Sequence, residues 1–262
     1  MKAILRTTKT LLVVYYAYMV EYRAELLLWV LANSLPLIMM GVWSQAAAGG
    51  QFSLTALDVA RYFISVFVVR QFTIVWVIYD FEREVVEGDL SPRLLQPIDP
   101  VWRHVAGHVS ERWARLPFSV GLVLLFFALY PEAFWWPSPL GLIWGCLATV
   151  MAFILRFIIQ YTFAMFAFWL ERATAIEQLW FLFYLFLSGM IAPLDLFPEA
   201  VRAVVMWTPF PYLIYFPVSL LVGISTPVAK GFAIMLAWCG LGILINRWLW
   251  RRGIKHYSGM GA

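Results

Sequence analysis

Charged residues are scarce in this sequence. Only 13% of its 262 residues are Asp, Glu, Lys or Arg, whereas 63% are hydrophobic. Soluble globular domains carry roughly 25% charged residues. The scarcity excludes an ordinary soluble enzyme and leaves no room for a large soluble domain beside the apolar segments. We therefore predict an all-α integral membrane protein with a single membrane domain over residues 1–262.

Motifs for several kinds of chemistry are also missing. The sequence has no glycine-rich phosphate loop ending in Lys-Ser or Lys-Thr, so we expect no ATP hydrolysis by the chain itself. Its two cysteines, Cys146 and Cys239, lie in apolar runs and are expected to pack there as small hydrophobic residues. No carboxylate stands at the centre of a predicted span, which argues against a carrier driven by protons or sodium ions. We expect no catalytic residue and no cofactor in this chain.

Histidine is rare as well, with three in the chain. His104 and His108 stand four residues apart, which is the spacing of a helical metal pair, and Glu111 would be a third ligand. The other interpretation is a polar helix face at a wet interface. Because no second cluster of ligands accompanies the pair, we favour the polar face and expect no metal.

Long apolar runs are what the sequence has in abundance. About 20 helical residues cross the ~30 Å hydrocarbon core of a bilayer. Pro36 lies in the middle of the first run and is expected to kink it. Before that run, residues 1–24 place Lys2, Arg6 and Lys9 on one helix face, which fits an interfacial helix or an extension of the first span. The six predicted spans are residues 26–46, 61–79, 116–134, 140–170, 176–191 and 228–249.

The distribution of basic residues predicts the orientation of these spans. Of the 19 Lys and Arg residues, Arg70 and Arg156 lie within spans, and Arg61, Arg202 and Lys230 lie on one side. All the others lie on the side that holds both termini. Basic residues accumulate on the cytoplasmic side. We therefore expect a multi-pass protein of the inner (plasma) membrane with both termini in the cytoplasm, and no nucleic-acid partner.

The most polar stretch is the segment at residues 80–115, called the insert below. Gly88 is expected to end the helix that enters it. Ser91 and Pro92 are typical of an N-cap followed by proline at the first helical position, and Pro97 ends the short helix. The short helix is expected to carry an exposed leucine pair, Leu94 and Leu95. It either docks a partner protein or is a solvated connector whose leucines fold back onto the membrane. The candidate contact residues are Asp89, Leu90, Ser91, Pro92, Arg93, Leu94, Leu95 and Pro97.

A second unusual stretch, the outer segment at residues 192–225, is apolar but interrupted by prolines. Proline removes a backbone donor, so one continuous helix is excluded. A pair of half-helices that dips into the outer leaflet fits better, and it would be either a gate or a lid. Asp195 and Glu199 would make an acid–base pair on paper, but capping and solvation are preferred. The candidate gate residues are Pro193, Pro198, Pro209 and Pro211.

Four polar residues are expected inside the spans. Arg70 stands near the middle of the second span, beside Gln71. A charge at that depth usually faces a bundle interior or a wet cavity. It therefore either contacts a polar part of a substrate or anchors one helix to another. Arg156 and Gln160 lie in the inner half of the fourth span, and Arg156 either belongs to the pathway or reaches to the cytoplasmic surface.

Two stretches taken together, EGDLSPRLLQPIDP and SGMIAPLDLFPEAVRAVVMWTPFPYLIYFPVSLLVG, resemble the six-span permease subunits of type-2 ABC transporters. The likeness extends over nearly the whole chain. It implies an N-terminal interfacial helix at residues 1–24, a cytoplasmic coupling helix in the insert, and external re-entrant helices in the outer segment. It also implies a separate ATPase in two copies, which binds ATP and Mg, and a second permease chain of the same or a related kind.

We therefore predict the permease subunit of an ATP-driven exporter for an amphipathic or hydrophobic compound, such as a drug, lipid, peptide or glycan-lipid. Alternating access would take place at the interface of two permease chains, in contact with membrane lipids. The direction of transport follows from the resemblance alone. Two alternatives stay open. One is a carrier or channel that works without ATP, and the other is a lipid-modifying membrane enzyme, which would need a polar catalytic cluster at one interface.

Overall fold

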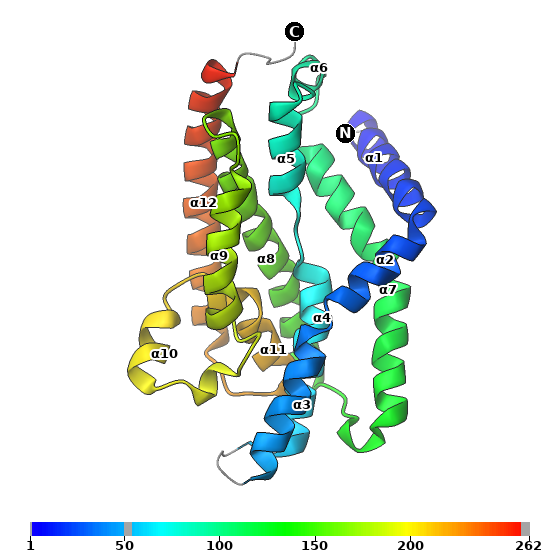
Figure 1. The fold of residues 1–262 in the computed structure, drawn as a ribbon, viewed down its shortest axis with the longest axis vertical. Coiled ribbons are helices and arrows are strands. Elements are labelled where there is room, and N and C mark those ends of the chain that lie inside the picture. Colours follow the sequence, from blue (N-terminus) through cyan, green and yellow to red (C-terminus); the bar gives the residue numbers. More distant parts are fainter. Residues whose placement is uncertain (1, 50–53, 258–262) are drawn as a thin grey trace.

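Every regular element is a helix, and no strand occurs, in residues 2–49 and 54–257, which are the residues described by the computed structural model. The all-α prediction is thereby confirmed. Five stretches are long and apolar enough to cross a membrane: Arg23–Ala47, Ala56–Val86, Val101–Leu129, Pro139–Phe168 and Val228–His256. They lie roughly side by side and give the molecule its long axis (Figure 1).

The predicted fifth span is shorter than a bilayer requires. It corresponds to α9 (Thr174–Leu187), a helix of 14 residues. At 1.5 Å per residue it is about 21 Å long. The six predicted spans are thus represented by five long stretches and this short helix.

The first span is divided into α2 (Arg23–Ala32) and α3 (Leu35–Ala48). Pro36 stands in the first turn of α3, where the missing N–H would be unsatisfied in any case. The interruption expected at Pro36 therefore lies just before it, at Asn33 and Ser34. Helix α1 (Lys2–Glu21) precedes α2 and packs along α7.

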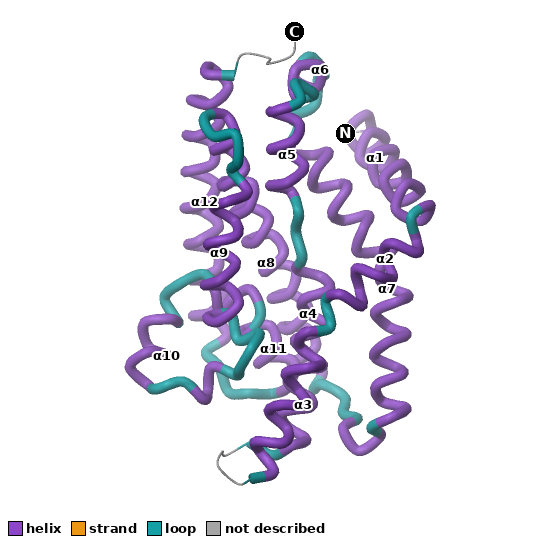
Figure 2. The backbone as a smooth tube through the Cα atoms, in the orientation of Figure 1, coloured by secondary structure: helices purple, strands orange, loops and turns teal. Residues whose placement is uncertain are grey.

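The second span is divided as well, which the sequence did not predict. Helix α4 (Ala56–Thr73) and helix α5 (Val77–Val86) are separated by non-helical residues 74–76, called the break below (Figure 2). The continuous helix predicted through Tyr79 is wrong. Helix α4 also begins earlier than predicted, because Thr55 and Asp58 form a capping box there.

The insert contains the short helix α6 (Leu90–Leu94) and the first part of α7 (Val101–Leu129). Gly88 has a φ of +83°, which ends α5 as predicted. Helix α7 continues through Pro117 without interruption, so the boundary expected between the insert and a third span at residue 116 is not a structural one.

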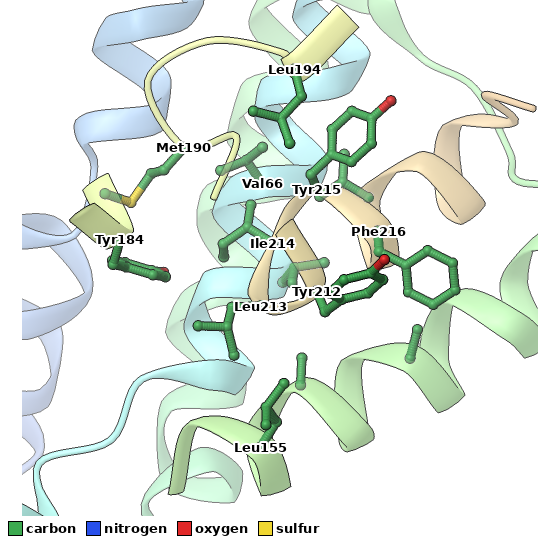
Figure 3. Close-up of a cluster of buried hydrophobic side chains, with 14 of the residues drawn as sticks. Val66, Leu155, Tyr184, Met190, Leu194, Tyr212, Leu213, Ile214, Tyr215 and Phe216 are labelled. Atoms are coloured by element: carbon green, nitrogen blue, oxygen red, sulfur yellow. The ribbon is translucent and has the colours of Figure 1, made fainter. Parts of the chain in front are cut away.

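The remaining helices enclose the largest buried cluster of the molecule. Helix α8 (Pro139–Ala164) continues into η2 (Met165–Phe168) and packs against α12 (Val228–His256). The cluster joins α4 and α8 to the outer segment through side chains such as Leu155, Tyr212 and Phe216 (Figure 3). Of the two cysteines expected to pack inside, Cys239 is buried, but Cys146 is exposed.

The outer segment forms four short helices in place of the expected pair. They are η3 (Leu194–Leu196), α10 (Glu199–Val205), η4 (Phe210–Leu213) and α11 (Tyr215–Val222). Helix α11 lies close to α8, because an added Cβ atom at Gly141 would come within 2.7 Å of the carbonyl oxygen of Leu220. The glycine therefore permits the two backbones to approach.

The two ends of the molecule differ in what they carry. The start of α1, helix α6 and the end of α12 lie toward one end, whereas α10, α11 and the end of α3 lie toward the other (Figure 1). The side of a membrane on which each end lies stays a prediction.

Candidate functional site

The tip of the insert is α6, and its leucines differ in exposure. Leu90 is fully buried, Leu94 is partly buried against the core around α5 and η2, and Leu95 is 88% exposed. The prediction of an exposed leucine pair is therefore wrong for Leu94. Ser91 is also not the N-cap, since α6 begins at Leu90, and its Oγ lies 3.1 Å from the hydroxyl of Tyr257. The exposed residues around the tip are Asp89, Pro92, Leu95, Gln96 and Pro97.

Ion pairs fasten α6 to the helices on either side. Arg93 pairs with Glu84 of α5, and the second oxygen of Glu84 lies 3.4 Å from Nε2 of His104 in α7. Burial lowers the pKa of Arg93 below its ordinary value. Glu84 and His104 are both buried. The predicted wet face for this histidine is therefore wrong, and the cluster holds three helices of the insert together.

Two contacts tie the insert to α12. Arg247 Nη1 donates to Oδ2 of Asp99 at 3.1 Å, and Tyr257 lies against Ser91 as described above. Asp99 Oδ1 also accepts a hydrogen bond from the N–H of Val101 at 3.0 Å, which satisfies the start of α7. A force applied at the tip is therefore distributed to α5, α7 and α12 together.

The break in the second span is held by side chains from α7. In a continuous helix the N–H of Trp76 would bond to the carbonyl of Phe72, but here it donates to His108 Nε2 at 2.9 Å. Arg112 takes the place of the Trp76 N–H as the donor to the Phe72 carbonyl, through its Nε at 2.6 Å. Its Nη2 also donates to the Ile74 carbonyl. In lipid such freed backbone groups need partners within the protein.

This arrangement also defines the protonation of His108. Its Nε2 accepts a hydrogen bond from the N–H of Trp76, so Nδ1 carries the ring proton and donates to the carbonyl of His104 at 2.8 Å. Both ring nitrogens are occupied, and the ring is buried. His108 is therefore a structural part of the break, and the sequence interpretation of a polar, wet helix face is wrong here too.

Arg70 makes the contacts of a helix-to-helix anchor. Its Nε and Nη2 donate to Asn33 Oδ1 at 3.1 and 2.9 Å, and Nη1 contacts the sulfur of Met190. Asn33 lies between α2 and α3, and its amide donates to the carbonyl of Trp29. Arg70 thus links the interruption of the first span to α4 and to the chain that enters the outer segment. A role in the pathway stays a prediction.

A second set of polar groups lies between α8 and α9. Gln160 Nε2 donates to Glu177 Oε1 at 2.6 Å, and the guanidinium of Arg156 lies 4.2 Å from the ring centroid of Tyr184. Arg156, Gln160 and Glu177 are all buried. Arg156 therefore does not reach the surface, and an ionisable carboxyl lies inside the bundle, which the sequence placed at the edge of a span.

Several atoms of this set have no hydrogen-bond partner within the described part of the chain. They include Oε2 of Glu177, Oε1 of Gln160, and Nε and Nη1 of Arg156. Outside this set, both polar atoms of the Gln71 side chain in α4 also lack a partner. Buried polar groups without partners are costly. Candidate residues from two of the predicted spans are thus buried polar groups, but no hydrogen bond joins Gln71 to the other three.

Polar contacts also organise the outer segment. Arg202 Nη2 lies 2.8 Å from Asp195 Oδ1, and the hydroxyl of Tyr215 donates to Asp195 Oδ1 at 2.9 Å. Asp195 therefore has partners that stabilise its charge, in keeping with the preference for a structural role. Pro198 stands directly before the first residue of α10, and Pro209 and Pro211 flank the start of η4.

The described residues contain no group of three His, Cys, Asp or Glu side chains placed to hold a metal ion. Comparison with known proteins gives one match. The family model described as ABC-2 family transporter protein matches residues 50–261. No curated protein matches the chain.

Proposed function

The chain belongs to the ABC-2 family of transporter membrane proteins, and from this premise we propose that it is the permease subunit of an ATP-driven exporter whose ATPase docks on the insert. Membership in the family makes the chain a transport subunit in a membrane and not itself an enzyme. The observation that carries the proposal beyond the family is the tip of the insert. Helix α6 lies at one extreme of the molecule (Figure 1), and Leu95, directly after it, is 88% exposed.

The surroundings of Leu95 support docking against another protein. It projects from a short helix whose other apolar residues, Leu90 and Leu94, are wholly or partly buried. The ion pair between Arg93 and Glu84 holds that helix in place. A rigid, isolated apolar side chain rimmed by polar residues is the kind of anchor that fits a small pocket on a partner.

The contacts of the insert suggest how movement of the ATPase would reach the membrane part. Helix α5 joins the tip directly to the break, and α7 joins the same two places through His104 at the tip and His108 and Arg112 at the break. A displacement of α6 would therefore be applied to the C-terminal end of α4 through two helices, α5 and α7. In this mechanism the angle between α4 and α5 changes at the break during transport.

The remaining parts of the proposal follow from the family and from chemistry. Two permease chains form the pathway at their interface and move an amphipathic or hydrophobic substrate outward by alternating access. In this proposal α9 is the fifth of six crossings, so both termini lie on one side of the membrane. The distribution of basic residues makes that side the cytoplasm and puts the outer segment on the other side of the plasma membrane. ATP and Mg are bound by two copies of the separate ATPase. Arg156, Gln160 and Gln71 are candidates for the pathway because they are buried and incompletely hydrogen-bonded.

Co-purification with an ATPase encoded beside this chain tests the proposal. We expect Leu95→Asp to abolish capture of the ATPase and transport-linked ATP hydrolysis, because a carboxylate cannot enter an apolar pocket without a partner. Leu57→Asp is the matched control. Leu57 is also an exposed apolar residue, but it lies at the opposite end in the first turn of α4, where an acidic side chain is favourable.

Unchanged capture and ATP hydrolysis in Leu95→Asp would refute docking at the tip. Reconstitution of the chain alone in liposomes separates the remaining alternatives. Substrate flux without any ATPase would indicate a carrier or channel and would refute the ATP-driven mechanism.

A further inference from the structure

An apolar groove of about 960 Å³ lies on the outside of the bundle, between η2 with the residues that follow it and the last turns of α12. Its walls are large apolar side chains, including Phe166, Leu170 and Ile245. Beside the groove, Gly253 of α12 lies so close to the ring of Phe168 that an added Cβ atom would collide with it. This close packing of η2 on α12 sets the two walls of an open surface groove.

The polar residues of the groove are of one sign and lie at one end. Arg252, Lys255 and His256 follow one face of α12 and line the groove, and no acidic residue lines it. In the part of the chain that the structure describes, neither Arg252 nor Lys255 forms an ion pair. Two uncompensated positive charges thus stand next to an apolar wall.

Aromatic contacts hold this basic end in position. The guanidinium of Arg252 lies over the ring of Trp248 at 4.7 Å, and Trp169 stacks on His256 with ring centroids 6.2 Å apart. Both tryptophans are exposed, with 53% of Trp248 and 41% of Trp169 accessible. Tryptophan and basic residues gather where a spanning helix meets the lipid headgroups. The groove therefore extends from the headgroup level into the apolar layer.

We propose that this groove binds an anionic phospholipid, with the phosphate beside Arg252 and Lys255 and an acyl chain along Ile245 and Phe166. The charge complementarity selects an anionic over a zwitterionic headgroup. The apolar wall selects a lipid over a small soluble anion. Both bounding elements belong to stretches long enough to cross a membrane, so a lipid has direct access. The site is separate from the insert and from the buried polar residues of α8 and α9.

Thermal unfolding of the purified, delipidated full chain tests the site. Phosphatidylglycerol at a large excess over its dissociation constant should raise Tm by at least about 5 °C, and phosphatidylcholine should not. Arg252→Gln with Lys255→Gln should abolish the difference between the two lipids. Arg172→Gln with Arg251→Gln removes the same charge from exposed positions outside the groove and should retain it.

The charge-preserving pair Arg252→Lys and Lys255→Arg should also retain lipid binding, which separates loss of charge from loss of structure. Native mass spectrometry should detect bound phosphatidylglycerol in the unchanged chain and much less in the glutamine pair. An equal Tm rise in both double-glutamine variants would overturn the proposal. The same rise in Tm with glycerol phosphate alone would also overturn it. So would the finding that a second copy of the chain covers the groove and protects it from lipid.

Discussion

Arg112→Met is the sharpest test of how the second span is held together. In the structure Arg112 donates to the carbonyls of Phe72 and Ile74 in the break, and its guanidinium lies 3.8 Å from the ring centroid of Phe153. Methionine keeps an unbranched apolar side chain and removes every donor. The Phe72 carbonyl cannot recover its helical partner, because the N–H of Trp76 is already bonded to His108.

The size of the effect can be bracketed. Hydrogen bonds between membrane helices contribute about 0.6 kcal/mol on average, which sets a lower limit of about 1 kcal/mol for two bonds. Hydrogen bonds from a charged donor contribute about 1.5–3 kcal/mol each, which sets an upper limit of about 6 kcal/mol. We expect about 3 kcal/mol, since the freed carbonyls are shielded from water. For a protein of this size that corresponds to a fall in Tm of roughly 6–12 °C.

Thermal unfolding of the purified protein measures this directly. Arg112→Lys should recover less than half of the loss, because one ammonium group cannot donate to both carbonyls in the forked geometry of a guanidinium. Arg251→Met, at an exposed residue, should change Tm by no more than about 2 °C. A fall in Tm of less than about 2 °C in Arg112→Met would show that the break does not depend on Arg112.

Two further substitutions test other parts of the bundle. Gly141→Ala should lower the free energy of unfolding by about 1–3 kcal/mol, because its Cβ atom meets the backbone of α11. Gly121 in α7 has open space around an added Cβ atom, so Gly121→Ala should be neutral or slightly stabilising. Urea titration measures the free energy of unfolding of both variants. Equal effects of the two substitutions would contradict the close approach of α8 and α11. A double-mutant cycle of Arg70→Met and Asn33→Ala should give a coupling energy of about 0.6–1.7 kcal/mol. A coupling near zero, with altered transport, would indicate a pathway role for Arg70 in place of an anchor.

Features decided by local chemistry were predictable from the sequence. Gly88 ends α5 because a left-handed residue costs glycine little, and Pro36 lies near an interruption because it has no N–H to donate. The capping box of Thr55 and Asp58 is also visible in the sequence as a Thr-x-x-Asp pattern.

Features decided by a distant partner were not predictable. Residues 74–76 are Ile, Val and Trp, which contain no helix-breaking residue. The break exists because His108 and Arg112 offer an acceptor and donors from another helix. Glu177 was missed for the same reason, since it stands near a span boundary in the sequence, whereas in the fold it is buried and hydrogen-bonded to Gln160 of another helix.

The length of α9 has a consequence for the bilayer around it. A helix of about 21 Å falls roughly 9 Å short of a typical hydrocarbon core. Each ångström of hydrophobic mismatch costs a fraction of a kcal/mol, through local thinning of the membrane or through withdrawal of the helix from lipid. The exposed side of α9 carries Leu179, Leu182, Phe183 and Phe186. As a membrane crossing, α9 would therefore favour contact of this surface with protein over contact with a bilayer of ordinary thickness, and its stability is expected to depend on the acyl-chain length of the surrounding lipid.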